Sequence, residues 1–549
     1  MTAADYHPPA VSPAADVRSR EPAWVAWMGL ALLSLAAVWW RWHNLNPPAL
    51  WLDDCWQAVL SEQSFGTQFR WRSSAPIGFT WLLGVVARLS GDPEVRYQLL
   101  PFICGVALVP AAFWAFPKRR AADRAGALVF AGWLALCPPL VVYSTRVKQF
   151  TLDALLVTLL LGAALRVRTT ARHLPWYGLL ALAALPFSFC SALFATIFLN
   201  LATLSHVLRT RRAGTRPHVA VAGTWAVYHV ALGLYYLLVL RAQKNTALVD
   251  YWADCYVKSP ADVATRLATL MAEVVPWTTG DGGVWQALAA TAVLLLAGGG
   301  VYRRVRQAGQ REAVLAAALL YLALVVLAAL RMYPLGAGRV DIHVHPVTVF
   351  LVVSALWLHP WPAVRRRWLA PALTGGATAA MLALGTLLHG GAPSTYPAVG
   401  DRGRMAAALH AAYREGDTVV VRPHGCFVFG YYTRWPYELV HAPYYATTFE
   451  IQPGPAAMHV LPGIPGYRRN PARLDPALDD ILAGRPRRLL LWAAGHRVSR
   501  HLNSRMLAAG YHGRGLFRDT KCLLVEYTLN AAVPRAGGSD RAPASRPLP

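Results

Sequence analysis

The chain has 549 residues, of which 55% are hydrophobic and only 15% are charged. Soluble domains carry about 25% charged residues, so this composition, together with repeated apolar runs of about 17 residues or more, indicates a polytopic helical membrane protein. The net charge of +25 does not indicate nucleic-acid binding, because the basic residues lie in short clusters between the apolar runs, where the positive-inside rule places them.

The first apolar run, residues 23–40, follows Arg18 and Arg20 and continues into Arg41-Trp42-His43 without a small-residue cleavage site. It predicts a retained signal anchor after a cytoplasmic segment of residues 1–22. Ten further apolar runs predict membrane spans if every basic cluster lies in the cytoplasm. These runs cover residues 97–116, 125–143, 151–167, 174–187, 190–207, 219–240, 284–301, 313–330, 341–358 and 369–389.

Two stretches decide the topology. Residues 174–207 are expected to cross twice, with an external turn near Pro186. The stretch Pro76–Ser90 is apolar but only fifteen residues long, so we expect an interfacial helix within a first external loop of residues 41–96. The result is eleven spans in a cell membrane, with the amino terminus in the cytoplasm and the carboxyl terminus outside.

After His389 the pattern changes to short alternating elements. Strands are predicted over residues 418–421, 488–492 and 523–527, and helices over residues 475–482 and 498–509. This alternation predicts a small extracytoplasmic α/β domain of residues 395–530, following a transmembrane domain of residues 23–390. Residues 531–549, rich in Pro, Ala, Arg and Ser, predict a disordered tail.

Two adjacent carboxylates, Asp53 and Asp54, follow the first apolar run in the stretch Leu50-Trp51-Leu52-Asp53-Asp54. Charges so close to apolar segments usually pair or do chemistry. Neighbouring helical residues point in different directions, so one carboxylate can cap a helix over residues 56–62 while the other faces a cavity. An N-cap beside a solvated acid is the plainer alternative. Chemically, the pair suits a general base that takes a proton from a hydroxyl group.

A second constellation runs from Tyr143 to Phe150, as Tyr-Ser-Thr-Arg-Val-Lys-Gln-Phe, and is followed by Asp153. The predicted topology places it on the same external face as Asp53. Arg146 and Lys148 run against the positive-inside bias there, and a phosphate group at the membrane surface would account for them. The alternative is that both side chains snorkel, with Lys148 neutralising Asp153.

A third constellation is the external loop of residues 331–339, in which Gly336 and Gly338 allow a tight turn that brings Arg339 close to a ligand. Asp341, His343 and His345 follow this loop. On an extended segment these three side chains could hold a divalent metal, whereas on a helix Asp341 and His345 would pair. A metal therefore remains an alternative, and the sequence predicts no definite cofactor.

Aromatic residues and cysteines complete the predicted external face. Tyr251, Trp252 and Trp277, in the loop of residues 241–283, could stack on a sugar, but an interfacial aromatic belt is the default interpretation. Cys426 and Cys522 could form a disulfide, as could Cys55 and Cys255, because an oxidising compartment preserves such bonds. Four separate thiols remain an equal alternative.

These features together resemble the GT-C superfamily of polyprenyl-phosphate-sugar glycosyltransferases, and within it the protein O-mannosyltransferase and lipid A aminoarabinose transferase type, glycosyltransferase family 39. The family places an Asp-Glu pair in the first external loop, where this chain has Asp53-Asp54. The stretch from Tyr143 to Asp153 is similar to the family's Tyr-Ser-x-x-x-Lys/Arg-x-Tyr stretch, with Phe150 in place of Tyr. Gly338-Arg339 is similar to its late Gly-Arg loop.

The resemblance implies an inverting membrane glycosyltransferase that moves a sugar from a polyprenyl-phosphate donor to a cell-envelope glycan, lipid or protein. Asp53, with Asp54 beside it, would be the catalytic base. Some relatives carry a basic residue where this chain has Ala75, so phosphate binding would fall on Lys148, Arg339 and Arg72. Arg146, Tyr143 and Asp153 would complete the substrate site. The alternatives are a transporter or flippase-like protein and a non-catalytic membrane scaffold.

Overall fold

The computed structural model of the chain describes residues 23–45, 50–118, 121–167, 173–215, 218–243, 249, 252–275, 284–306, 310–336, 338–357, 369–389, 401–422, 425–444, 447–453, 458–461, 470–494, 496–518 and 522–530. The predicted cytoplasmic segment and tail, residues 1–22 and 531–549, lie outside these ranges, as do Tyr251 and Trp277. The chain divides into two units: a helical unit of residues 1–48 and 74–396, and an α/β unit of residues 49–73 and 397–549.

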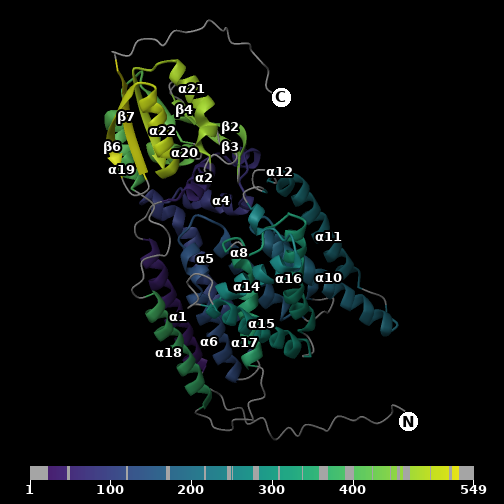
Figure 1. The fold of residues 1–549 in the computed structure, drawn as a ribbon. Coiled ribbons are helices and arrows are strands. Elements are labelled where there is room, and N and C mark those ends of the chain that lie inside the picture. The colour runs from purple at the N-terminus through teal and green to yellow at the C-terminus, as the bar shows by residue number, and fades with distance from the viewer. Residues whose placement is uncertain are drawn as a thin grey trace, which may run out of the picture. The chain divides into compact units, whose positions relative to one another are not determined.

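The helical unit consists mainly of apolar helices (Figure 1). Its elements are α1 (Ala23–Trp42), η2 (His43–Leu45), α4 (Ile77–Val86), α5 (Pro93–Ala115), α6 (Ala121–Leu136), α7 (Pro138–Tyr143), α8 (Phe150–Ala164), α9 (Leu174–Ala184), α10 (Phe189–Arg212), α11 (Val219–Tyr235), η3 (Tyr236–Leu240), α12 (Arg241–Gln243), η4 (Ala253–Cys255), α14 (Pro260–Glu273), α15 (Val284–Val305), α16 (Arg311–Ala329), η5 (Ile342–Val344), α17 (His345–Trp357) and α18 (Leu369–His389).

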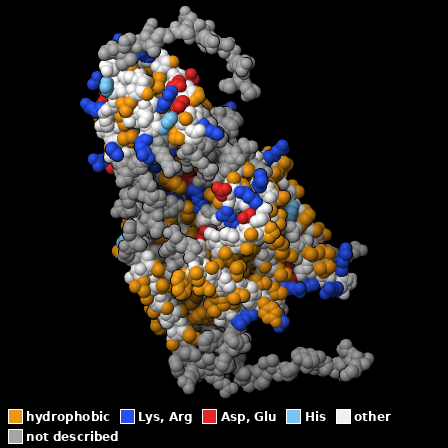
Figure 2. All heavy atoms as spheres, viewed as in Figure 1, with side chains coloured by type: hydrophobic (Ala, Val, Ile, Leu, Met, Phe, Trp, Pro, Cys, Tyr) orange, Lys and Arg blue, Asp and Glu red, His pale blue; other side chains and the backbone are white. Residues whose placement is uncertain are grey.

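Six described helices are long and apolar enough to cross a membrane, and five shorter apolar helices accompany them. Hydrocarbon offers no hydrogen-bond partners to the backbone, whereas a helix pairs its own N–H and C=O groups. Apolar runs of this length therefore form helices. Their outer faces carry large apolar side chains such as Trp27, Leu35 and Leu295. Figure 2 shows such side chains gathered over the helical unit on the face in view. The chain is a multi-pass membrane protein.

Small residues let these helices approach closely. At Gly300 in α15, an added Cβ would lie 2.0 Å from the carbonyl oxygen of Leu351 in α17, so any side chain there would push the two helices apart. At Gly385 in α18 an added Cβ would meet the Trp40 ring of α1 at 2.0 Å. Close backbone contact of this kind is how helices associate in a medium as apolar as their own surfaces.

Each of the eleven predicted spans contains a described helix, which confirms the helical membrane fold. The run of residues 125–143 is broken at Cys137 into α6 and α7, because Pro138 lacks an N–H group and starts a new helix. The predicted turn near Pro186 separates α9 from α10. The stretch Pro76–Ser90 forms only the ten-residue helix α4, which is too short to cross a membrane.

The α/β unit contains a five-stranded sheet, a two-stranded hairpin and short helices. Its elements are α2 (Leu52–Ser61), α3 (Phe65–Arg70), α19 (Arg402–Ala412), β1 (Thr418–Val421), α20 (Gly425–Thr433), β2 (Tyr437–Tyr444), β3 (Thr447–Pro453), β4 (Met458–Val460), η6 (Pro471–Leu474), α21 (Asp475–Ala483), β5 (Arg488–Ala494), α22 (His496–Ala508), β6 (Tyr511–Arg518) and β7 (Cys522–Leu529). Charged side chains are spread over the part of its surface in view (Figure 2).

The large sheet has the order β4-β1-β5-β7-β6, in which β1 pairs parallel with β4 and β5, and β7 pairs antiparallel with β5 and β6. Its apolar strands are covered by helix side chains including Leu478 and Leu502, which share one buried cluster with Leu491. Strands β1, β5 and β7 and helices α21 and α22 confirm the predicted elements. The hairpin β2–β3, strands β4 and β6, and helices α19 and α20 were not predicted.

Residues 49–73 belong to the α/β unit, whereas the sequence predicted that the whole first loop, residues 41–96, is part of the transmembrane domain. The reason is visible in the contacts of α2, which packs against α20 through Trp56 and Phe427, with ring centroids 6.1 Å apart. Trp71 similarly lies 6.4 Å from Phe449 in β3. The segment that carries Asp53 therefore folds with residues more than three hundred positions later in the chain.

Candidate active site

The two adjacent carboxylates lie in the first turn of α2 and have different environments. Asp54 is fully buried, and its Oδ2 accepts a hydrogen bond of 2.9 Å from the backbone N–H of Trp51, the residue that precedes the helix. A carboxylate at this position satisfies an orphan N–H group and complements the positive end of the helix. Asp53 is partly exposed. Asp54 therefore fits the helix-capping role, and Asp53 is the more exposed of the two carboxylates.

Arg72 lies in the same unit, after α3. Its Nε donates a 3.0 Å hydrogen bond to the carbonyl oxygen of Phe69, and its guanidinium lies 5.1 Å from the centre of the Phe69 ring. The side chain is partly exposed.

The stretch from Tyr143 to Asp153 forms a turn in the helical unit between α7 and α8. The rings of Tyr143 and Phe150, one on each side of this turn, make an edge-to-face contact with centroids 5.1 Å apart. Lys148 is buried and Arg146 is partly exposed. Phe150 thus serves as a packing partner for Tyr143 across the turn.

A buried arginine that was not predicted, Arg41, forms a hydrogen bond with the turn between α7 and α8. Arg41, at the end of α1, is fully buried, and its Nε donates a 3.0 Å hydrogen bond to the Ser144 hydroxyl. Its Nη1 donates to the carbonyl oxygen of Ala135 at 3.1 Å. An added Cβ at Gly105 would lie 2.0 Å from the Ser144 hydroxyl, so that glycine leaves room for the pair. Its only signal in the sequence is weak: an arginine at the end of an apolar run.

Asp153 joins a buried polar cluster. It is buried in the first turn of α8, near Ser188, Cys190 and Tyr333. The Tyr333 hydroxyl lies 3.5 Å from the Cys190 sulfur and donates a 2.6 Å hydrogen bond to the carbonyl oxygen of Val340. Two of the predicted constellations, the turn before α8 and the loop after α16, therefore meet in the helical unit.

The loop after α16 has the tight geometry that its glycines predicted. Gly336 and Gly338 have φ angles of +63° and +76°, which residues with a side chain rarely adopt. An added Cβ at Gly336 would also lie 3.0 Å from the carbonyl oxygen of Arg266 in α14. Arg339 follows this turn, and its guanidinium lies 5.0 Å from the centre of the Trp252 ring, a distance typical of a cation–π contact.

The Asp341, His343 and His345 series takes neither of the predicted arrangements. It forms a short 3-10 helix leading into α17, in which His343 Nδ1 lies 3.1 Å from the carbonyl oxygen of Val340. His345 Nε2 lies 3.4 Å from an oxygen of Glu273 at the end of α14. Within the described ranges, no group of three or more His, Cys, Asp or Glu side chains is placed to hold a metal ion. None of the seven cysteines forms a disulfide.

The predicted site residues divide between the two units. Asp53, Asp54 and Arg72 lie in the α/β unit, and the other five lie in the helical unit: Tyr143, Arg146, Lys148, Asp153 and Arg339. Within each unit the structure brings together residues that are distant in the sequence. Glu273 and Cys190 were missed because they lie in ordinary amphipathic or apolar helices, and Ser188 was missed because it directly precedes one, where nothing in the local pattern marks a polar contact.

The fold is similar to that of known proteins, although no family model and no curated protein matches the sequence. The crystal structure of ArnT from Cupriavidus metallidurans bound to undecaprenyl phosphate matches with a TM-score of 0.52 at 13% identity, over 93% of this chain and 99% of that one. The same protein in the apo state matches with a TM-score of 0.41 at 12% identity, over 92% and 98% of the two chains.

A third similar structure is that of the arabinofuranosyltransferase AftD from Mycobacteria, with a TM-score of 0.45 at 15% identity, over 91% of this chain and 41% of that one. These last two scores are too low to support an inference. The first match covers nearly all of both chains and shows the fold: this chain shares the helical membrane fold of that protein, together with a C-terminal α/β unit.

Proposed function

We propose that this protein is an inverting glycosyltransferase that uses a polyprenyl-phosphate-linked sugar, of the protein O-mannosyltransferase and aminoarabinose transferase type. The observation that carries the proposal is Asp53, a partly exposed carboxylate in the first turn of a helix directly after the first apolar helix of a GT-C fold. ArnT, which shares this fold, is bound to undecaprenyl phosphate in its crystal structure, and this supports a polyprenyl phosphate donor.

In the proposed reaction Asp53 takes the proton from an acceptor hydroxyl group, whose oxygen then forms a bond to the anomeric carbon of the sugar. The bond between that carbon and the phosphate oxygen breaks on the opposite face, so the configuration inverts. The lipid phosphate leaves with the bonding electrons. Cationic side chains stabilise its developing negative charge, and Lys148 and Arg339 are the residues to which we assign this role.

The other predicted residues have supporting roles in this proposal. Arg146 and Arg72 add positive charge for the phosphate, because arginine binds phosphate oxygens through paired donors. Tyr143 holds the turn that carries Lys148 through its contact with Phe150. Asp153, a buried carboxylate near Tyr333, completes the substrate site. The acceptor is a cell-envelope glycan, lipid or protein outside the membrane, and the α/β unit, residues 397–530 with 49–73, lies on that side.

The test compares the cell envelope with and without the protein. Mass spectrometry of envelope glycans, lipids and proteins should show one sugar modification that disappears when the gene is deleted and returns with the wild-type chain. Asp53→Asn keeps the shape of the side chain but cannot accept the proton, so it should restore nothing while inserting normally in the membrane. Full restoration by Asp53→Asn would favour a scaffold or transporter function and refute the catalytic assignment.

A further inference from the structure

The start of α2 is held by side chains from the C-terminal part of the α/β unit. Leu50 lies three residues before Asp53, and both of its backbone polar groups are bound. Its N–H donates a 3.0 Å hydrogen bond to the Tyr432 hydroxyl in α20, and its carbonyl oxygen accepts a 2.6 Å bond from Nη1 of Arg402 at the start of α19. These two bonds fix the chain just before the first turn of α2.

The hydrogen bond from Arg402 can fix the position of the Leu50 carbonyl group. The Arg402 side chain is buried, and within the described part of the chain it forms no ion pair with a carboxylate. A buried guanidinium that donates to a carbonyl makes a charge-assisted bond, which is shorter and stronger than a neutral one. Since few other partners are available to this cation, its position depends on the Leu50 carbonyl, and the position of that carbonyl depends on the cation.

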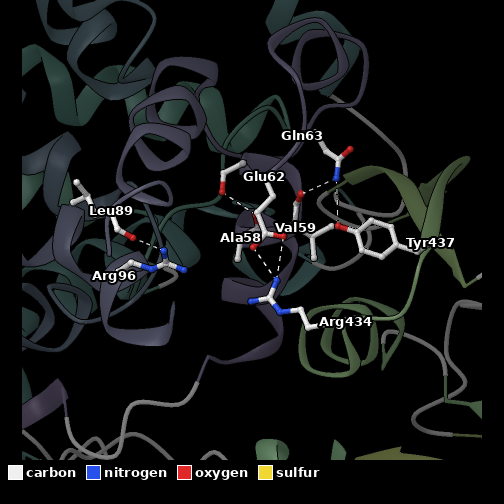
Figure 3. Close-up of polar contacts among 9 residues, drawn as sticks. Ala58, Val59, Glu62, Gln63, Leu89, Arg96, Arg434 and Tyr437 are labelled. Carbon is white, nitrogen blue, oxygen red and sulfur yellow. Dashed lines mark hydrogen bonds and ion pairs between the residues drawn. The ribbon is translucent and has the colours of Figure 1, made fainter. Parts of the chain in front are cut away.

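The far end of α2 is held as well. Glu62, which directly follows the helix, accepts hydrogen bonds of 2.9 and 3.2 Å from Nη1 of Arg434, and Gln63 donates a 3.3 Å bond to the Tyr437 hydroxyl (Figure 3). Burial and the neighbouring Glu62 carboxylate raise the pKa of Tyr437 to about 12, so its hydroxyl remains neutral. In the helical unit, the bond from Arg96 to the carbonyl of Leu89 closes a separate turn (Figure 3).

We infer that the C-terminal part of the α/β unit positions the catalytic carboxylate, with Arg402 as the main positioning residue and Tyr432 as its support. This inference rests on the proposed function of Asp53. It assigns to residues 397–530 a part in the reaction beyond contact with the acceptor: they hold α2 at both ends, so that Asp53 keeps one orientation while the buried Asp54 caps the helix.

The reactivity of Cys55 shows how firmly the start of α2 is fixed, and it can be measured without an activity assay. Its side chain is fully buried, and its thiol donates to the same Leu50 carbonyl at 3.8 Å. In the full-length protein in detergent, Cys55 should react slowly with a maleimide, as followed by mass spectrometry of the Cys55 peptide. Arg402→Ala should speed this labelling by tenfold or more. Arg402→Lys, which keeps a donor and a charge, should show an intermediate rate.

Arg404 provides a matched control. It lies on the same helix two residues away, its side chain is 80% exposed, and its ion-pair partner is Asp401 at 3.8 Å. In Arg404→Ala, the maleimide should label Cys55 at the wild-type rate. If Arg402→Ala fails to fold, Tyr432→Phe removes only the hydroxyl that binds the Leu50 N–H and should still raise the labelling rate. Labelling at the wild-type rate in both Arg402→Ala and Tyr432→Phe would overturn the inference.

Kinetics with a polyprenyl-phosphate sugar donor separate positioning from general destabilisation. A misplaced base lowers turnover, so Arg402→Ala should lower kcat by about 10- to 100-fold while the KM for the donor stays within twofold. Arg402→Lys should recover part of the loss. Faster Cys55 labelling with an unchanged kcat would refute the positioning role. If wild type and Asp53→Asn transfer sugar equally, or neither does, the proposed function fails, and the labelling result still decides whether Arg402 and Tyr432 hold α2.

Discussion

The two neighbouring aspartates, Asp53 and Asp54, have different environments in the structure. We therefore expect their substitutions to change the local stability of α2 differently. Asp54→Ala removes the carboxylate that accepts the 2.9 Å bond from Trp51 N–H. An unsatisfied, partly buried N–H group and the lost charge at the helix N-terminus together should cost about 2–3 kcal/mol of local stability. Asp54→Asn keeps an oxygen in the same place and should cost about 0.3–1 kcal/mol, the value of the charge alone.

Hydrogen exchange of the amides of residues 51–55 measures this local stability in the full-length protein. Because 1.4 kcal/mol corresponds to a factor of ten, protection should fall by about 30- to 150-fold in Asp54→Ala and by about two- to fivefold in Asp54→Asn. Asp53→Asn, which changes the partly exposed neighbour, should leave protection unchanged and abolish sugar transfer. The reasoning is refuted if Asp54→Asn abolishes transfer with normal protection, since Asp54 would then carry out the chemistry.

Two further predictions concern the helical unit. Lys148→Ala and Arg339→Ala should each weaken transition-state binding of the donor by about 2–4 kcal/mol, seen as lower kcat/KM; normal donor kinetics in both variants would place the phosphate site elsewhere. Gly336→Ala should destabilise the helical unit by about 1–3 kcal/mol in thermal unfolding, because its φ is +63° and a Cβ would lie only 3.0 Å from Arg266. Gly223→Ala, with open space around it, is the control and should not destabilise.

The membrane helices and the central strands were predictable because local chemistry determines them. Hydrocarbon permits only internally hydrogen-bonded backbone, so an apolar run such as residues 313–330 has one outcome, the helix α16. Strand β1 was predictable for a similar reason: Thr418-Val419-Val420-Val421 is a short β-branched run after a Gly-Asp turn, and all four residues are buried.

The hairpin β2–β3 was not predictable in the same way. Residues 437–444 mix Tyr, Glu, His and Pro without regular alternation, and their strand conformation depends on pairing with residues 447–453. Strand β6, residues 511–518, contains two glycines and two arginines and forms at the sheet edge by pairing with β7. In both cases tertiary pairing overrides local propensity.

The candidate site shows the same limit. Its carboxylates, cations and glycines were visible in the sequence because each is unusual where it stands, next to an apolar run. The residues that hold them were not visible. Arg402 binds the carbonyl of Leu50 across 352 positions of the chain, and Arg41 binds Ser144 across 103. No local pattern records such partners, so the sequence predicted the groups to which we assign the chemistry and missed the residues that bind near them.

The orientation of the protein in the membrane can be tested with thiols, and the structure changes how that test must be designed. Cys426 and Cys522 lie in the α/β unit but are only 1% and 2% exposed, so neither should react in the folded protein on either side of the membrane. Cys255, in the loop between α12 and α14, is partly exposed. An exposed reporter for the α/β unit is Arg404→Cys, because the Arg404 side chain is 80% exposed.

A membrane-impermeant maleimide applied to intact cells should label Cys255 and Arg404→Cys if both segments face the exterior. Burial raises the pKa of the Cys255 thiol, so less of the reactive thiolate is present at neutral pH, and its labelling should rise steeply between about pH 7 and pH 9. The exposed reporter should show a weaker pH dependence. Labelling of both sites only after the cells are permeabilised would place Asp53 and the α/β unit in the cytoplasm, and the proposed transfer to an external acceptor would then be wrong.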